Sequence, residues 1–161
     1  MSSQSYYKSR RQSATPGIPR PGWHRPEELL DSRVFGVVLD TSGSMDTRPL
    51  GKALGVIASY AAAREVRAAR VVFCDAEAHD NGWMHPTDIA GRVRVKGRGG
   101  TVPQPGIALL QEAADFPQDG PLLIITDGAC DRLTVRRDHA YLIPQAATLP
   151  FRPRGPVFRL R

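Results

Sequence analysis

Three apolar runs that each end at an aspartate do most to limit what this chain can fold into. The runs cover residues 35–39, 70–74 and 122–126, and they are followed by Asp40, Asp75 and Asp127. Apolar and polar residues do not alternate within the runs, so each run predicts a strand that is buried on both faces. Such strands are typical of parallel sheets covered by helices. We therefore expect a layered α/β domain.

Helical periodicity occurs between these runs. Pro49 suits the first turn of a helix, and the apolar residues after it recur at three- and four-residue intervals, which predicts one buried face. These residues are Leu50, Ala53, Leu54, Ile57 and Ala61. A second helix is expected from Pro105, with core positions at Ile107, Leu110, Ala114 and also Leu109. Strands that alternate with helices predict a doubly wound, mostly parallel central sheet flanked by helices.

The segment between the second and third apolar runs gives weaker signals. We expect a short strand near Trp83, a helical turn that starts near Pro86, and a strand at residues 93–95. Residues 140–143 predict a last short strand. The folded domain is therefore expected to cover residues 32–146.

Basic and proline-rich segments flank this domain. Residues 1–31 are rich in Pro, Ser, Gln and Arg, which predicts a flexible tail or linker, and residues 147–161 are expected to form a basic C-terminal extension. The net charge of the whole chain is +6. The arginines at the two ends are either solvated surface or a means of holding nucleic acid through salt-sensitive contacts.

Cysteine content and hydropathy indicate the compartment. The two cysteines, Cys74 and Cys130, are too few for a disulfide framework and are expected to be reduced thiols. No run approaches the roughly 20 uncharged apolar residues of a membrane span, and the N-terminus lacks the apolar core of a secretory signal. We expect a cytoplasmic protein. A zinc site built from the acidic, histidine and cysteine side chains of residues 74–85 is disfavoured, because their spacing matches no zinc motif.

The first aspartate opens a motif of the form D-x-S-x-S, Asp40-Thr41-Ser42-Gly43-Ser44, directly after a predicted buried strand. Two further pieces follow in order, Gly99-Gly100-Thr101 and Thr126-Asp127-Gly128. Together the three pieces resemble the metal-ion-dependent adhesion site of von Willebrand factor A (vWA) domains. That site takes an aspartate and two serines from one loop, a threonine from a second and an aspartate from a third. The resemblance spans about residues 33–143 and implies a vWA/Rossmann-like fold.

The resemblance implies a bound cation, held by Asp40, Ser42, Ser44, Thr101 and Asp127. Mg²⁺ prefers about six oxygen ligands and usually keeps several waters, whereas Ca²⁺ prefers more ligands and more direct carboxylates. Mg²⁺ or Mn²⁺ is therefore expected. If both aspartates act through water, as the resemblance implies, the ion keeps an open position for a carboxylate of a partner protein. The alternative is that Asp40 and the serines only cap the following helix.

Residues 72–76 and 97–101 are similar in particular to the vWA-like domains of bacterial metallopeptidase-like proteins. Val102 departs from that pattern, because a polar or acidic residue is common at its position. The resemblance implies a metal-dependent protein–protein interaction module, an adaptor in a larger bacterial complex that is associated with an AAA+ ATPase system. The alternative function is a nucleic-acid-associated scaffold that uses the arginine-rich ends.

Enzyme motifs are missing from the sequence. Ser42 stands where a phosphotransferase of the D-x-D type needs its second aspartate. Gly51-Lys52 lacks the upstream glycine of a Walker A loop, and neither G-x-S-x-G nor H-E-x-x-H occurs. We therefore expect a non-catalytic binding domain.

Overall fold

The computed structural model describes residues 4–5, 7–8, 34–42, 47–93 and 102–161. The chain divides into two compact units, Met1–Asp31 and Ser32–Arg161. In the first unit, β1 (Gln4–Ser5) pairs with β2 (Tyr7–Lys8) in antiparallel fashion. The rest of the tail expected at residues 1–31 lies outside the described residues.

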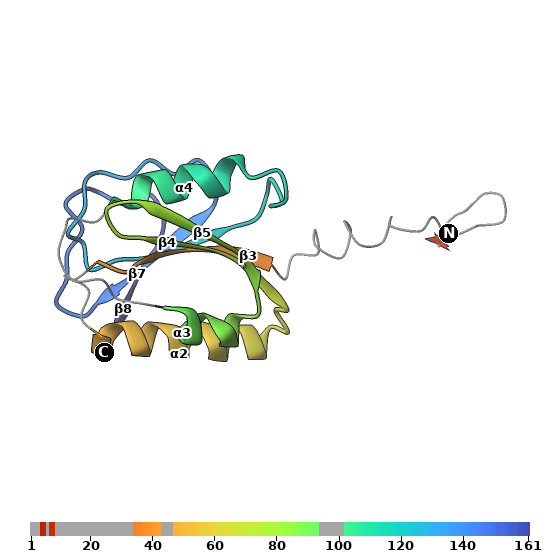
Figure 1. The fold of residues 1–161 in the computed structure, drawn as a ribbon, viewed down its shortest axis with the longest axis horizontal. Helices are drawn as coiled ribbons and strands as arrows, with labels where there is room; N and C mark the ends of the chain where they lie inside the picture. The colour runs from red at the N-terminus through yellow and green to blue at the C-terminus, as the bar shows by residue number, and fades with distance from the viewer. Residues whose placement is uncertain (1–3, 6, 9–33, 43–46, 94–101) are drawn as a thin grey trace. The chain divides into compact units, whose positions relative to one another are not determined.

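The second unit is built on a six-stranded sheet with the order β5-β4-β3-β6-β7-β8 (Figure 1). Its strands are β3 (Val34–Asp40), β4 (Ala68–Cys74), β5 (Ala78–Met84), β6 (Leu122–Ile125), β7 (His139–Pro144) and β8 (Val157–Leu160). Neighbouring strands are parallel except for β4 and β5. The prediction of an α/β fold with a mostly parallel sheet is confirmed.

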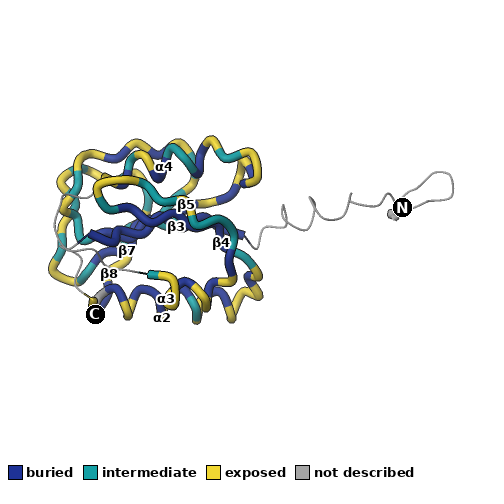
Figure 2. Tube along the Cα trace, viewed as in Figure 1, coloured by how far each residue is buried: buried dark blue, intermediate teal, exposed yellow. Residues whose placement is uncertain are grey.

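The central strands are buried on both faces, as the lack of alternation predicted. All residues of β3 are buried, and only Ala68 of β4 is partly exposed. Figure 2 shows these strands in the middle of the unit. The strand β5 is only partly buried, because it lies at the edge of the sheet that the described residues form. The core therefore lies along the central strands, and Asp40, Asp75 and Asp127 stand at or just after the carboxyl ends of these strands.

Helices cover both faces of this sheet (Figure 1). α2 (Thr47–Ala63) and the short α3 (Ile89–Arg92) lie on one face, and α4 (Pro103–Glu112) lies on the other. The apolar positions predicted for the first helix are all buried. Both long helices begin two residues before the expected start, α2 at Thr47 and α4 at Pro103. Pro49 and Pro105 still lie in the first turn, where proline is tolerated.

Two details of the helix predictions need correction. Ala114 is exposed instead of facing the core. It lies beyond the end of α4, because Ala113 already has extended backbone angles. Val93 is not in a strand, and residues 94–95 of the strand expected there lie outside the described residues. The strand near Trp83 and the helical turn from Pro86 are confirmed as β5 and as the 3-10 turn Pro86–Asp88.

The C-terminal segment is part of the sheet. In place of the extension expected at residues 147–161, the chain forms β8, which pairs in parallel with β7. The connections on either side of β7 contain no helix, and Leu133, Val135 and Phe151 from them pack on the α4 face. Pro150, Pro153 and Pro156 explain why this segment gives no helical or strand signal. None of the helices among the described residues is long and apolar enough to cross a membrane.

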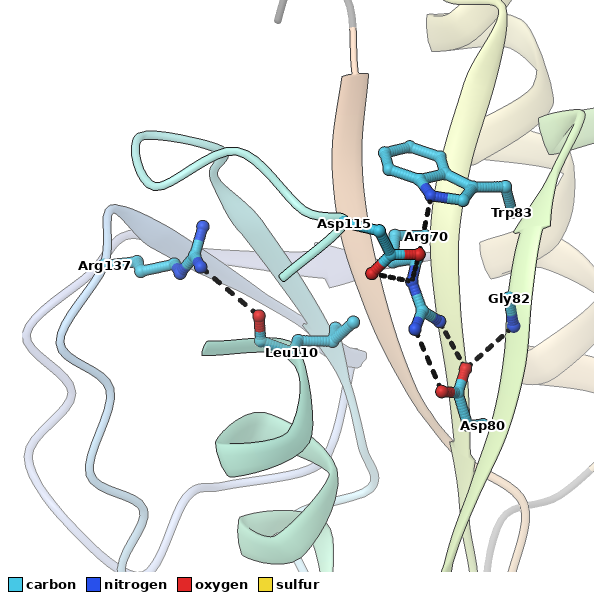
Figure 3. Close-up of polar contacts among 7 residues, drawn as sticks. All are labelled: Arg70, Asp80, Gly82, Trp83, Leu110, Asp115 and Arg137. Atoms are coloured by element: carbon cyan, nitrogen blue, oxygen red, sulfur yellow. Dashed lines mark hydrogen bonds and ion pairs between the residues drawn. The ribbon is translucent and has the colours of Figure 1, made fainter. Parts of the chain in front are cut away.

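Two arginines fasten the α4 layer to the sheet (Figure 3). Arg70 on β4 forms a two-pronged ion pair with Asp80 of β5 and also contacts Asp115, which follows α4. Trp83 Nε1 donates to the same Asp115 carboxylate at 3.1 Å. Arg137 donates to the Leu110 and Gln111 carbonyls in the last turn of α4, at 3.3 and 3.1 Å. Main-chain oxygens at a helix C-terminus are favourable partners for a cation.

Candidate metal centre

The sheet topology brings two of the predicted loops together. After β3 the chain builds β4 and β5 on one side, and it then returns to place β6 on the other side of β3. Leu39 and Ile125 are register partners near the carboxyl ends of β3 and β6. Ligands of open α/β sheets bind at such a reversal of strand order. Asp40 is the last residue of β3 and Asp127 comes shortly after β6, so both lie at the edge where a ligand site is expected.

The Asp40 side chain is buried, with 1% of the residue exposed. Its Oδ1 accepts a hydrogen bond from the Ser42 main-chain N–H at 2.9 Å. Its Oδ2 accepts from the Thr126 hydroxyl at 3.2 Å. Thr126 Oγ1 in turn accepts from the Gly128 N–H at 3.1 Å. The carboxylate is therefore oriented by a donor from its own loop and by Thr126, which is 86 residues from Asp40 in sequence.

Asp127 lies in a tight turn at the same edge. Its side chain is half-buried, and its Oδ1 accepts from the Ala129 N–H at 2.9 Å. The turn depends on Gly128, which has a φ of +88°. A Cβ atom at Gly128 would lie 2.1 Å from the Thr148 carbonyl oxygen. Glycine is thus required both by the backbone conformation and by the close approach of the chain.

The remaining loops are also tied to this edge. The Thr41 N–H and hydroxyl both donate to the Cys74 carbonyl of β4, at 2.8 and 3.2 Å. The Val102 N–H donates to the Asp75 carbonyl at 2.9 Å, which holds the start of α4 near the end of β4. Of the predicted ligands, Asp40, Ser42 and Asp127 are described, and Ser44 and Thr101 lie outside the described residues.

The helix-cap alternative does not fit Asp40 and Ser42. An N-cap residue lies immediately before its helix, whereas α2 begins at Thr47. The partners of Asp40 given above belong instead to its own loop and to the residue after β6. Asp40 is therefore not the N-cap of α2, and its carboxylate joins its own loop to the residue after β6.

Both cysteines lie close to this edge. Burial, and then the negative charge of Asp40, raises the pKa of the Cys74 thiol to about 12. Burial also raises the pKa of Cys130, and the charges of Asp40 and Asp127 act in the same direction, although a hydrogen bond with Thr126 opposes them. Both thiols therefore stay protonated near neutral pH.

Asp75 has a local structural role in the hairpin between β4 and β5. Its Oδ1 accepts from the Glu77 N–H at 2.9 Å and lies 3.1 Å from His79 Nε2. No group of three or more His, Cys, Asp or Glu side chains in the described part of the chain could hold a metal ion. A centre at this edge would therefore need hydroxyl ligands, which the predicted set contains.

The role of Thr126 at this edge was not predicted from the sequence. Thr126 is fully buried, and its hydroxyl links Asp40 to the turn at Gly128. A hydroxyl residue between an apolar run and an aspartate was the available signal, since a threonine at a strand end can bond to a neighbouring loop. Comparisons with protein-family models and with curated proteins find no match to this chain.

Proposed function

We propose that this chain is a vWA-like domain with a metal-ion-dependent adhesion site that binds one Mg²⁺ or Mn²⁺ ion. The ligands would be Asp40, Ser42, Ser44, Thr101 and Asp127. The proposal rests on the buried Asp40 carboxylate, whose two oxygens accept hydrogen bonds from two separate loops. Burying a charged group costs folding free energy, so a carboxylate kept in this position indicates a role beyond stability.

The strand order supports the finer assignment of the fold. Counted along the sheet, the strands lie in the chain order third, second, first, fourth, fifth and sixth. This order occurs in doubly wound folds, which bind ligands beside the first and fourth strands. In this chain these strands are β3, which ends at Asp40, and β6, which Asp127 follows.

The side chains at this edge suit a hard divalent cation. Asp40, Ser42 and Asp127 offer carboxylate and hydroxyl oxygens, which Mg²⁺ and Mn²⁺ prefer over nitrogen and sulfur. When bound, the ion would supply an electrophilic centre with a position open to an outside ligand. The hydrogen bond from the Thr126 hydroxyl would hold one Asp40 oxygen in a fixed orientation. Gly128 would allow the tight turn that places Asp127 at the site.

The function that follows is protein binding without catalysis. A cation held largely by neutral hydroxyls is under-neutralised, so a carboxylate from a partner protein is its natural outside ligand. A module of this kind would act as an adaptor in a larger cytoplasmic complex. An AAA+ ATPase system is the assembly suggested by the sequence resemblance.

Titration calorimetry with Mn²⁺ tests the metal site directly. We expect one site per chain, and Asp127→Ala should weaken binding by at least about tenfold, because one charged ligand is lost. Asp131→Ala is the matched control, since Asp131 is an exposed aspartate that lies only four residues further on. Equal binding by wild type and by the double variant Ser42→Ala/Ser44→Ala would refute the site, provided that the circular dichroism spectra agree.

A second candidate function uses the arginines. Arg132, Arg136, Arg152 and Arg154 are all exposed on the connections around β7. Exposed arginines hold phosphate backbones through contacts that weaken steeply with salt. Binding to random RNA or DNA that persists in EDTA and is lost at moderate salt would favour this nucleic-acid scaffold. Partner binding that is lost in EDTA at constant salt would favour the metal-dependent module.

A further inference from the structure

The α2 face of the sheet carries a large groove away from the candidate metal centre. The groove has a volume of about 1280 Å³. One wall is α2, and the floor is formed by the beginning of β3 and by β6, β7 and β8. Among the described residues, no helix other than α2 lies on this half of the face, and α2 packs there against Leu142 and Leu160. The opposite half, over β3 and β4, is covered by α2 and α3.

The groove gathers most of the large exposed apolar side chains of the described residues. Of the four large hydrophobic residues that are exposed in the described part of the chain, three line it. These are Val56 at 51%, Tyr60 at 49% and Phe158 at 56% exposure. They come from α2 and from the edge strand β8. Contiguous exposed apolar surface with a polar rim is typical of a binding site for another molecule.

The rim of the groove is basic. Lys52 and Arg64 lie on α2 and directly after it, and Arg161 follows β8. Neither aspartate nor glutamate is among the residues that line the groove. Two of the cations also bind main-chain oxygens of the domain. Lys52 Nζ donates to the Arg161 oxygen, and the Arg159 guanidinium, which also borders the groove, donates to the Gln145 and Ala147 carbonyls. The electrostatic field at the rim therefore favours an acidic occupant.

The dimensions of the groove fit a short helix. Lys52 and Arg64 lie near the two ends of α2, and this part of the chain gives a wall of about 18 Å at roughly 1.5 Å per residue. A sheet face next to an existing helix is the place where α/β proteins pack another helix. An apolar stripe on such a helix would cover Tyr60 and Phe158, and acidic residues beside the stripe would meet Lys52 and Arg64.

We propose that this groove binds an amphipathic, acidic helix of a partner protein. The proposal does not depend on the metal site, because none of the groove residues is a predicted ligand. A second copy of this chain is a poorer occupant, because a two-fold interface would bring two basic rims together. A lipid surface is also a poorer fit, because the apolar residues line a groove instead of protruding from the protein.

A peptide titration in the presence of EDTA tests the proposal. The probe is a fluorescein-labelled, 18-residue helical peptide of Leu, Ala and Glu, with leucines at three- and four-residue spacing. The control peptide has the same composition in an order without periodicity. We expect fluorescence anisotropy to show binding of the first peptide at least about tenfold tighter than of the second, because only the first presents an apolar face.

Matched protein variants locate the binding. Phe158→Asp, and separately Lys52→Glu/Arg64→Glu, should each weaken binding about tenfold or more. Val102→Asp and Arg67→Glu are the controls, because both residues are exposed and neither lines the groove. Circular dichroism of each variant checks the fold, and the charge-reversed variant tests the groove even if Phe158→Asp unfolds the protein.

Three results would overturn the proposal. The first is equal binding of the periodic and the scrambled peptide. The second is self-association in sedimentation velocity that Phe158→Asp abolishes, which would assign the groove to a second copy. The third is co-sedimentation with phosphatidylglycerol vesicles that Phe158→Asp abolishes, which would assign it to a lipid surface. None of these outcomes affects the metal proposal, because the measurements are made in EDTA.

Discussion

The two faces of the sheet are covered in different ways. On the α4 face, α4 and the irregular connections around β7 pack over the sheet, and Arg70 and Arg137 bind the layers together. On the α2 face, α2 and α3 cover one half, and the other half is an apolar groove with a basic rim. Within the described residues, the sheet is therefore covered along its α4 face and only partly covered along its α2 face.

This difference separates residues that serve stability from residues that serve association. On the α4 face, buried polar groups find partners within the domain, so a substitution there acts on folding. On the open half of the α2 face, apolar side chains end in solvent, so a substitution there has little effect on folding. The comparison can be tested by placing similar substitutions on the two faces.

The largest effect is expected at the Arg70 cluster. The Arg70 side chain is only 7% exposed, whereas those of Asp80 and Asp115 are 41% and 53% exposed. Asp80→Ala/Asp115→Ala leaves a buried cation without these carboxylates and should cost about 3 kcal/mol. Arg70→Met leaves two carboxylates that water can solvate and should cost only about 1 kcal/mol. Urea unfolding of the two variants measures the difference.

The reverse order of stability would contradict this account of the cluster. Equal losses would also contradict it, because they would mean that the cost lies in the lost pair and not in the buried charge. The variants need the same m-value as wild type for the comparison to hold.

Two helical glycines offer the most direct comparison of the faces. A Cβ atom at Gly106 of α4 would lie 2.4 Å from Cys74 Sγ, whereas one at Gly55 of α2 would meet nothing within 4 Å. Gly106→Ala should destabilise the fold by about 1–3 kcal/mol through overpacking. Gly55→Ala should stabilise it by about 0.5–1 kcal/mol, because alanine favours the helix. Thermal unfolding distinguishes the two, and a loss of stability in both variants would mean that α2 is as closely packed as α4.

The sequence predicts best where one physical signal decides the structure. The apolar runs of β3, β4 and β6 lack alternation because both faces of these strands are buried, and all three strands occur where expected. The face of α2 was predictable for the same reason, from its three- and four-residue spacing. Asp40 and Asp127 could be placed at one edge because carboxyl ends of parallel strands share it.

The features that depend on tertiary contacts could not be predicted in this way. β8 is a short edge strand with one well-buried residue, Leu160, so its local pattern is weak. The link from Thr126 to Asp40 joins residues that are far apart in sequence. The groove beside α2 lies where the described residues place no second helix, and no local residue pattern encodes such a gap. Its basic rim joins α2 with β8, two elements from opposite ends of the domain.

The smallest expected effect is the pH dependence of the Arg70–Asp80 pair. Hydrogen bonds from Arg70, and also from the Gly82 N–H, hold the pKa of Asp80 below its ordinary value of 3.8. Asp80 binds a proton less readily in the folded state than in the unfolded state, so the pair stabilises the fold above about pH 4. This contribution is lost as the pH falls through the lower, folded-state pKa. Because the Asp80 side chain is 41% exposed, solvent should limit it to less than about 1 kcal/mol. Urea unfolding of wild type and Asp80→Asn should therefore show a stability difference that shrinks in acid and with added salt, whereas Asp131→Asn should show no such trend. If the stability difference between wild type and Asp80→Asn instead stays constant down to the pH at which the protein unfolds, the pair stabilises the fold through packing and hydrogen-bond geometry and not through charge.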